Sequence, residues 1–493
     1  MTLAAPDPAL DPASDRGPAS GAPADGADGG DGLWSPQRRG LTVGLVLTIT
    51  LVAFESLAIA TVMPEVKDDL GGLALYGWVF SGFFLASLLG IVVSGQMADR
   101  RGLALPFAAG LVLFAVGLVV GGAAQSMPML VAGRLAQGFG AGAIPAVAYA
   151  AIGRGYPSRL RPRMFATTST AWVVPGLIGP GVATLVEHAF TWRLVFLGLL
   201  PIVLVAGVMA VPALRALGSP VALVDGVRPV TDPLVAADDR RRLARVALLV
   251  LGVGAVLAAT ADAPLLLGIV LGVVGLPLAA WAFVGLVTRG TVRLVPGVPA
   301  PIAVRGLLTC AFFAGDAYVS LAITDGRGAA TWVAGLALSA GSITWSCASW
   351  TQARLIDRHG PRRLVQVGVL VIAGGIALML GVALGLPVAF GVVAWAVGAF
   401  GMGLAYSPLS VTVLGAAKPG EEGSASAALQ LSDTLGVAVG TGIGGSIIAF
   451  GDAGGWAVSS GTAVVFAAAL VVAVGTLFAA RRLPTSVPQH TPA

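Results

Sequence analysis

Residues 95–102 read Gly-Gln-Met-Ala-Asp-Arg-Arg-Gly, and residues 353–360, which lie 258 positions further along the chain, read Ala-Arg-Leu-Ile-Asp-Arg-His-Gly. An aspartate, the arginine after it and the last glycine coincide in the two copies, which aligns Asp99, Arg100 and Gly102 with Asp357, Arg358 and Gly360. Each copy follows a long apolar run, so the charges stand where a hydrophobic helix is expected to end. The repeat therefore predicts that one helical unit occurs twice in this chain.

The composition places the chain in a membrane. Of its 493 residues, 56% are hydrophobic and 11% are charged, and the mean hydropathy is +0.90. Soluble domains carry about 25% charged residues, and a chain this apolar has too little polar surface to stay dissolved. We therefore exclude soluble enzymes, disordered scaffolds and nucleic-acid-binding proteins, although the sequence pI is about 9.7. The expected partner is the lipid bilayer.

The first residues differ from the rest of the chain. Residues 1–38 are mostly Ala, Pro, Gly and Asp and contain almost nothing to bury. We expect residues 1–40 to form a disordered cytoplasmic tail. The tail lacks the basic start, apolar core and small-residue cleavage site of a signal peptide, so the first hydrophobic stretch is expected to be retained as a span.

Apolar runs of about 20 residues, the length that crosses about 30 Å of hydrocarbon, recur along the chain. Fourteen such runs are predicted as transmembrane helices: 41–64, 75–98, 103–124, 127–151, 164–187, 192–213, 243–261, 264–288, 302–324, 330–351, 363–385, 388–415, 424–449 and 455–480. The fold class is thus an all-α membrane protein.

The basic residues predict the orientation of these helices. With both termini in the cytoplasm, 25 of the 29 Lys and Arg residues fall on the cytoplasmic face, including Arg305 near the start of the ninth span. Cytoplasmic loops of membrane proteins are enriched in Lys and Arg. We therefore expect a multi-pass protein of the cell (inner or plasma) membrane with both termini cytoplasmic.

The spacing of the repeat predicts the domain organisation. Its copies lie eight spans apart, whereas a duplicated six-helix bundle would separate them by six, so two helices have been inserted between the halves. Parallel six-helix repeats are typical of transporters. The expected parts are bundles at 41–213 and 302–480, a loop at 214–242, an inserted helix pair at 243–290 and a cytoplasmic tail at 481–493.

On these residues the chain resembles the major facilitator superfamily, and within it the fourteen-helix drug:proton antiporters, from residue 41 to residue 480. Residues 95–102 are similar to the superfamily's loop motif between helices 2 and 3. The resemblance implies a conformational latch, in which Asp99 pairs across the bundle with basic neighbours; a turn with charged caps is the alternative. The latch residues are Gly95, Asp99, Arg100 and Gly102, with Asp357, Arg358 and Gly360 in the second copy.

The fourth span contains Arg134-Leu-Ala-Gln-Gly-Phe-Gly, which is similar to the family's fourth-helix motif. An arginine inside a span is costly and normally has a partner. Glu55 is the expected partner, because the two residues lie about nine and seven residues below the outer ends of their helices, a difference of roughly 3 Å at 1.5 Å per residue. Glu55 stands nine residues before Pro64, where the family's first-helix motif usually has Asp. The alternative is a buried structural ion pair without a role in transport.

The fifth span contains Pro175-Gly-Leu-Ile-Gly-Pro-Gly, which resembles the motif of the family's exporters, with Pro175 in place of its first glycine. Glycines allow helices to approach closely, and a proline removes a backbone donor and bends the helix. The resemblance implies an antiporter hinge; ordinary helix packing is the alternative. The hinge residues are Gly176, Gly179, Pro180 and Gly181.

Two further acids lie within predicted spans. Asp316 falls in the same layer as Glu55 and Arg134, and we group these three residues as candidates for proton coupling, because apolar surroundings disfavour the charged form of a carboxylate. Asp433 is a candidate cavity residue, together with Gln137 and Trp172; helix packing explains Asp433 equally well. No Walker loop is present and the three histidines are isolated, so we expect no ATP-driven pump, cofactor, metal site or enzymatic activity.

These patterns and the resemblance together imply a monomeric secondary transporter. It is expected to export small apolar or amphipathic compounds in exchange for protons by alternating access. An importer or facilitator of a small metabolite is the first alternative, disfavoured by the fifth-span motif. A receptor or scaffold that transports nothing is the second.

Overall fold

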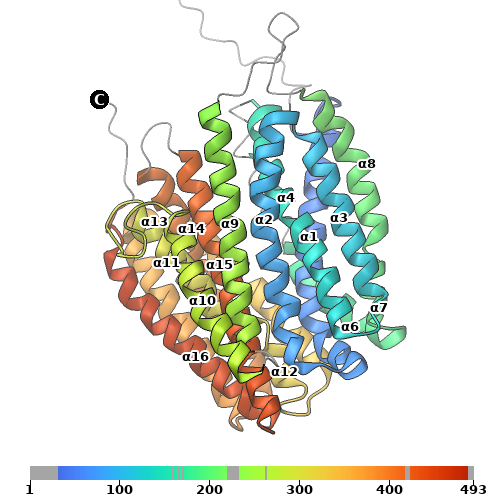
Figure 1. The fold of residues 1–493 in the computed structure, drawn as a ribbon, viewed down its shortest axis with the longest axis vertical. Coiled ribbons are helices and arrows are strands. Elements are labelled where there is room, and N and C mark those ends of the chain that lie inside the picture. Colours follow the sequence, from blue (N-terminus) through green and yellow to red (C-terminus); the bar gives the residue numbers. More distant parts are fainter. Residues whose placement is uncertain are drawn as a thin grey trace, which may run out of the picture.

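The computed structural model describes residues 32–157, 160, 163–164, 167–168, 171, 173–218, 233–260, 264–416 and 422–486, and in these ranges it is helical with connecting turns and no strand. Figure 1 shows long helices that run side by side along the vertical axis. The first half contains α1 (Arg39–Leu70), α2 (Tyr76–Arg101), α3 (Ala104–Gly122), α4 (Met127–Gly155), α6 (Val173–Ala189), α7 (Arg193–Leu197) and α8 (Leu200–Ala216).

Two helices, α9 (Pro233–Thr260) and α10 (Leu265–Val284), connect this half to the second. The second half contains α11 (Pro299–Asp316), α12 (Val319–Ile323), α13 (Thr331–Ala383), α14 (Ala389–Ala416), α15 (Glu422–Ala453) and α16 (Val458–Ala479). Short 3-10 helices lie at Leu73–Leu75 and Ala480–Arg482.

Glycines allow the helices to pack with their backbones in contact. A Cβ atom on Gly138 of α4 would lie 2.0 Å from the carbonyl oxygen of Phe83 in α2, so only glycine fits there. Lipid supplies little hydrophobic driving force between helices, and such close approach replaces it with van der Waals contact. The many glycines of the sequence therefore contribute to packing within each half.

The two halves meet along two helix pairs, α2 with α15 and α6 with α13. The α9–α10 pair lies outside this junction, and α9 contacts both α2 and α15. Leu88 of α2, Val246 of α9 and Leu431 of α15 belong to one buried hydrophobic cluster. The connecting pair is thus packed against both halves at once.

The all-helical membrane fold predicted from the sequence is confirmed. Among the described helices, twelve stretches are long and apolar enough to cross a membrane. The fifth and tenth predicted spans coincide with α6 and with the first part of α13, which are not among the twelve. The count of fourteen therefore remains a prediction.

Several predicted boundaries are wrong. The loop expected between 351 and 363 is replaced by a sharp kink at Gly360 (φ 71°, ψ 162°), where the two helices that make up α13 meet. The helix α9 begins at Pro233, inside the segment predicted as a loop. The sixth and ninth predicted spans agree with the apolar stretches Arg193–Ala216 and Pro299–Ile323, although a short break divides each of them into two helices, α7 with α8 and α11 with α12. Most of the predicted tail at 1–40 lies outside the described residues.

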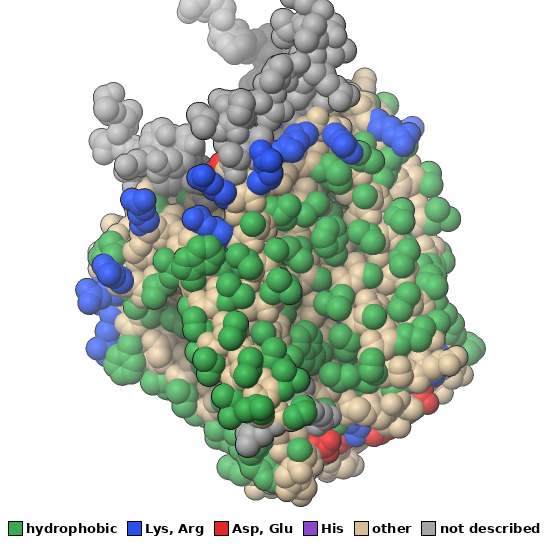
Figure 2. Space-filling model, viewed as in Figure 1, with side chains coloured by type: hydrophobic (Ala, Val, Ile, Leu, Met, Phe, Trp, Pro, Cys, Tyr) green, Lys and Arg blue, Asp and Glu red, His purple; other side chains and the backbone are tan. Residues whose placement is uncertain are grey.

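Basic and acidic side chains gather at opposite ends of the molecule's long axis. Figure 2 shows Lys and Arg side chains around the end where α2 ends and α9 begins, Asp and Glu side chains at the opposite end, and a broad apolar belt between them. We call these two ends the arginine-rich end and the acidic end. A belt of this kind is expected where lipid chains cover the protein.

Candidate functional site

The first half contains an ion pair that is almost completely buried. Glu55 of α1 and Arg134 of α4 are 1% and 2% exposed, and Nη1 of Arg134 donates to Oε1 of Glu55. Nε of Arg134 donates to the carbonyl oxygen of Val79 in α2 at 3.0 Å. The structure therefore brings together the two residues that were expected to pair because they lie at similar depths along their helices. The backbone of α2 helps to hold the guanidinium.

Gln137 and Phe83 complete the surroundings of this pair. Oε1 of Gln137 accepts from Nη1 of Arg134 at 3.2 Å, and its Nε2 donates to Oε1 of Glu55 at 3.4 Å. The Arg134 guanidinium lies 4.3 Å from the centre of the Phe83 ring. Oε2 of Glu55 is buried and has no hydrogen-bond partner within the part of the chain that the structure describes. An unsatisfied buried carboxylate oxygen is costly, so this atom is available for a proton or for a donor group of a ligand.

The second half has a buried ion pair of its own. Nε of Arg305 in α11 donates to Oδ1 of Asp433 in α15 at 2.7 Å, and the Tyr406 hydroxyl of α14 donates to Oδ2 of Asp433 at 3.0 Å. Nη1 of Arg305 donates to the carbonyl oxygen of Tyr406 at 2.6 Å, and the guanidinium lies over the Tyr406 ring. Asp433, predicted as a cavity residue, therefore joins three helices.

The count of basic residues groups Arg305 with the cytoplasmic face, but the structure buries this side chain. It lies inside α11 and is 4% exposed. Prolines favour the first helical positions, and Pro299 and Pro301 mark a helix start that precedes the predicted boundary at 302. This signal in the sequence would have placed Arg305 deeper within the helix and required a buried partner for it.

Asp316 occupies a different place from the other proton-coupling candidates. It is the last residue of α11, at the break before α12, and its Oδ1 accepts from Nε1 of Trp395 at 2.8 Å. The Trp395 ring stacks on Phe312 with 5.0 Å between the ring centres. Asp316 thus lies in the second half, whereas Glu55 and Arg134 lie in the first.

The two copies of the repeat share a backbone feature. Gly102 ends α2 with φ 81°, and Gly360 interrupts α13 with φ 71°, and both values belong to the left-handed region that glycine adopts at least cost. The side chains of Asp99 and Asp357 lie outside the described residues, so the predicted latch partner of Asp99 stays a prediction. A Cβ atom added to Gly95 would meet open space.

Arg100 binds a residue that the sequence did not single out. Its Nη2 donates to Oδ2 of Asp239 at 2.9 Å, and Nε2 of Gln96 donates to the Asp239 carbonyl oxygen at 2.7 Å. Asp239 lies in the first turns of α9. The first copy of the repeat is therefore tied to the helix that connects the two halves.

The predicted hinge lies between α1 and the second half. A Cβ atom on Gly176 of α6 would lie 2.6 Å from Cβ of Ser342 in α13, and one on Gly179 would lie 3.7 Å from Phe54 in α1. Pro180 lies inside α6, and a Cβ atom added to Gly181 would meet open space. The glycines of this segment thus permit contact across the junction of the halves. Trp172, the remaining predicted cavity residue, lies outside the described residues.

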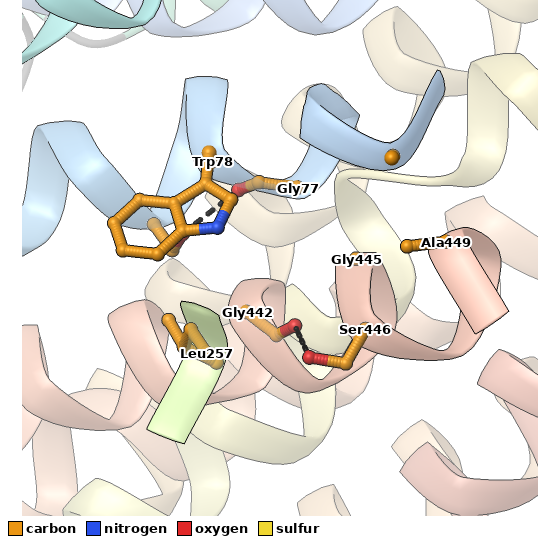
Figure 3. A pocket seen from close by; sticks show the side chains of 9 residues that line it. Gly77, Trp78, Leu257, Gly442, Gly445, Ser446 and Ala449 are labelled. Carbon is orange, nitrogen blue, oxygen red and sulfur yellow. Dashed lines mark hydrogen bonds between the residues drawn. The ribbon is translucent and has the colours of Figure 1, made fainter. Parts of the chain in front are cut away.

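At the acidic end the two halves are in direct contact. Lys67 at the end of α1 donates to Asp325, which follows α12, and a Cβ atom on Gly77 of α2 would lie 2.3 Å from Cα of Gly445 in α15. Figure 3 shows Gly77 and Trp78 facing Gly442, Gly445 and Ser446 across a narrow space. The cavity there measures about 10 Å³, which holds at most one water molecule. The structure is therefore closed between α2 and α15 at this end.

Residues 45–353 match the sequence model of the Major Facilitator Superfamily. The chain belongs to this superfamily. Superfamily members are transporters rather than enzymes, and the match covers the first half, the connecting pair and the start of the second half. This superfamily member is thus a multi-pass membrane transporter.

Similar proteins include several that are named as drug exporters. A probable multidrug-efflux transporter of Mycobacterium tuberculosis (strain H37Rv) is 28% identical over 467 residues, which cover 90% of this chain and 96% of the relative. Multidrug resistance protein 3 of Bacillus subtilis is 28% identical over 156 residues, which cover 32% of this chain and 30% of that protein.

Solved structures of the same fold extend over nearly the whole chain. A peptide transporter POT in complex with sulfate has a TM-score of 0.65 at 16% identity, and covers 90% of this chain and 94% of its own. A bacterial homologue of the human lysosomal transporter Spinster, in an inward-facing and occupied conformation, has a TM-score of 0.63 at 16% identity, with 93% and 100% covered. These similarities show the superfamily fold alone.

Proposed function

We propose that this transporter exports small apolar or amphipathic compounds in exchange for protons. The observation that carries the proposal is the buried Glu55–Arg134 pair, whose carboxylate keeps one oxygen without a partner. Ionisable residues inside membrane-spanning helices are expensive and are characteristic of ion and proton pathways. In this chain the pair lies within the first half of a superfamily transporter.

The chemistry of the pair fits proton exchange. While Arg134 is in contact with Glu55, the charge of Arg134 favours the ionised form of Glu55. Burial away from Arg134 favours the neutral form, because an apolar environment penalises an unpaired charge. A conformational change that separates the two side chains would therefore load a proton onto Glu55, and their reunion would release it.

The junction of the halves supports alternating access. The described contacts at the acidic end hold α1 against the segment after α12, and α2 against α15. A transporter that alternates must break such contacts to open that end. By the proposed orientation, with fourteen spans and both termini in the cytoplasm of the cell membrane, this is the outer end, and we propose that a monomer performs the whole cycle.

The relatives support export and drug-like substrates. Two of the proteins similar to this chain are named for multidrug efflux or multidrug resistance. The glycine-rich segment of α6 at the junction of the halves is consistent with this direction of transport.

Transport in sealed proteoliposomes tests the proposal. The purified protein is reconstituted, a pH gradient is imposed, and accumulation of a panel of amphipathic drugs is followed with and without a protonophore. We expect uphill accumulation that collapses when the protonophore is added, together with drug-induced proton movement in the opposite direction. Movement down the drug gradient without proton flux would indicate a facilitator, drug flux in the same direction as protons would indicate an importer, and no movement would favour a receptor or scaffold.

A further inference from the structure

A groove of about 420 Å³ lies on the connecting helix pair. Its lining residues come from both helices and from the residue after α10: Arg245, Ala280, Trp281, Val284 and Gly285. We call it the α9–α10 groove. It lies at the arginine-rich end, because Arg245 follows Asp239, which binds Arg100 at the end of α2.

Arg245 is held across the floor of this groove. Its Nη1 donates to the carbonyl oxygen of Gly285 at 2.8 Å, and a Cβ atom on Gly285 would lie 3.0 Å from both Nε and Cζ of Arg245. The absence of a side chain at position 285 therefore lets the guanidinium lie flat against the end of α10. Only one of its nitrogens takes part in this hydrogen bond, and the others retain N–H donors.

The rest of the groove is apolar and exposed, as expected of a surface that faces lipid. Trp281 and Val284 are 60% and 57% exposed, and Val273 on the same helix is 67% exposed. Tryptophan is enriched where the hydrocarbon meets the headgroups. Arg241 and Arg242 are exposed about one turn before Arg245, and residues at this spacing share a helix face.

We propose that the α9–α10 groove binds an anionic phospholipid. Its phosphate is recognised by Arg245 with Arg241 and Arg242, and an acyl chain lies along Trp281 and Val284. Guanidinium groups suit phosphate because they are planar and donate more than one hydrogen bond. Basic pockets between membrane helices bind acidic headgroups for the same reason. The inference requires only that the chain lies in a bilayer, and it gives the connecting pair a binding role of its own.

Brominated lipids test this proposal, because bromine quenches tryptophan fluorescence on contact. The protein is reconstituted in phosphatidylcholine with small fractions of phosphatidylglycerol, and the acyl chains of one lipid or the other are brominated. The signal of Trp281 is obtained by subtracting the fluorescence of Trp281→Phe from that of the unchanged protein. We expect brominated phosphatidylglycerol to quench this difference signal at a mole fraction at least about fivefold lower than brominated phosphatidylcholine requires.

Arg245→Gln removes the charge that would select the headgroup, and we expect the preference for phosphatidylglycerol to fall about fivefold. The matched control is Arg327→Gln at the acidic end, whose Nη2 also donates to a glycine carbonyl, that of Gly385 at 3.2 Å. The control should keep the full preference. Equal quenching by the two lipids in the unchanged protein, no quenching by either, or a preference that survives Arg245→Gln would each overturn the proposal.

Discussion

The guanidinium of Arg100 and the carboxylate of Asp239 lie 2.9 Å apart and join the end of α2 to the start of α9. Both side chains are partly exposed, at 46% and 30%, so water screens the pair. Exposed ion pairs contribute about 0–1 kcal/mol to stability. An energy of this size is too small to determine the fold, but it changes the ratio of two conformations by up to about fivefold. The contact is thus strong enough to favour one conformation of α2, but too weak to hold α2 in that conformation.

Asp239→Asn should therefore change transport more than stability. The substitution removes the charge of the side chain, while the backbone carbonyl of residue 239, which accepts from Nε2 of Gln96, remains. We expect an unchanged melting temperature and a two- to fivefold change in transport rate that disappears at high salt. The adjacent Asp238→Asn is the control and should leave the rate unaltered. If the double variant Arg100→Gln/Asp239→Asn changes the transport rate by the combined effects of the two single variants, the contact between these residues has no role in transport.

Arg305 and Asp433 should behave as a single unit in stability measurements. Both are almost completely buried, so removing one leaves the other as an uncompensated charge, at a cost of about 3–5 kcal/mol. We expect Arg305→Met and Asp433→Leu each to lower the unfolding temperature strongly, and the double change to recover most of the loss. Thermal unfolding in detergent measures this. Additive losses in the double variant would show that the pair is not coupled.

The all-helical membrane fold could be predicted because hydropathy depends on local sequence. The Glu55–Arg134 pair also followed from depth along two helices, since a buried arginine needs a partner and few acids lie at its level. The Arg305–Asp433 pair was missed, because Arg305 lies only three residues after the predicted start of its span and was counted with the cytoplasmic face. The contact between Lys67 and Asp325 was also missed, since it depends on how the two halves meet, and hydropathy carries no information about that.

The orientation of the chain and the number of spans can be tested together by reporter fusions. Fusions after Arg163 and Arg363 should report a cytoplasmic location, and an insertion between Asp325 and Gly328 should report an external one. The reason is the concentration of Lys and Arg at one end of the molecule (Figure 2). A cytoplasmic signal from the insertion at 325–328 would rule out the proposed fourteen-span topology.

Closure at the acidic end should depend on the contact between Gly77 and Gly445. Gly77→Val places a branched side chain where even one Cβ would be 2.3 Å from Gly445, so the helices must separate. We expect Ala449→Cys, in a protein without its native cysteines, to react several times faster with a membrane-impermeant maleimide when Gly77→Val is present. Gly82→Ala is the matched control, because the nearest atom to its Cβ would be Cδ2 of Leu135 at 3.4 Å, which is an ordinary van der Waals contact with the flexible end of a side chain. Equal labelling with Gly77→Val and Gly82→Ala would show that this contact does not close the end.

Proton coupling is predicted to depend on Glu55. Glu55→Gln keeps the size of the side chain and an oxygen that can accept from Arg134, but it cannot exchange a proton. We expect uphill, proton-driven drug efflux to be abolished, while drug binding and downhill exchange remain measurable in proteoliposomes. Glu55→Asp should retain partial activity, because the carboxylate is preserved and only its reach is shortened.

Glu65→Gln is the control for the loss of a carboxylate in α1. Glu65 lies ten residues further along the helix, near the acidic end, where its Oε1 accepts from the Thr331 hydroxyl at 3.4 Å. The Glu65→Gln variant should retain uphill efflux, because among the described residues Glu65 has no ion pair with a buried arginine of the kind that Glu55 forms. If Glu55→Gln drives uphill efflux at the unchanged rate, the proton is carried elsewhere. Asp316 is then the next residue to test, because its carboxylate lies at the break between α11 and α12 with the Trp395 indole as its hydrogen-bond donor.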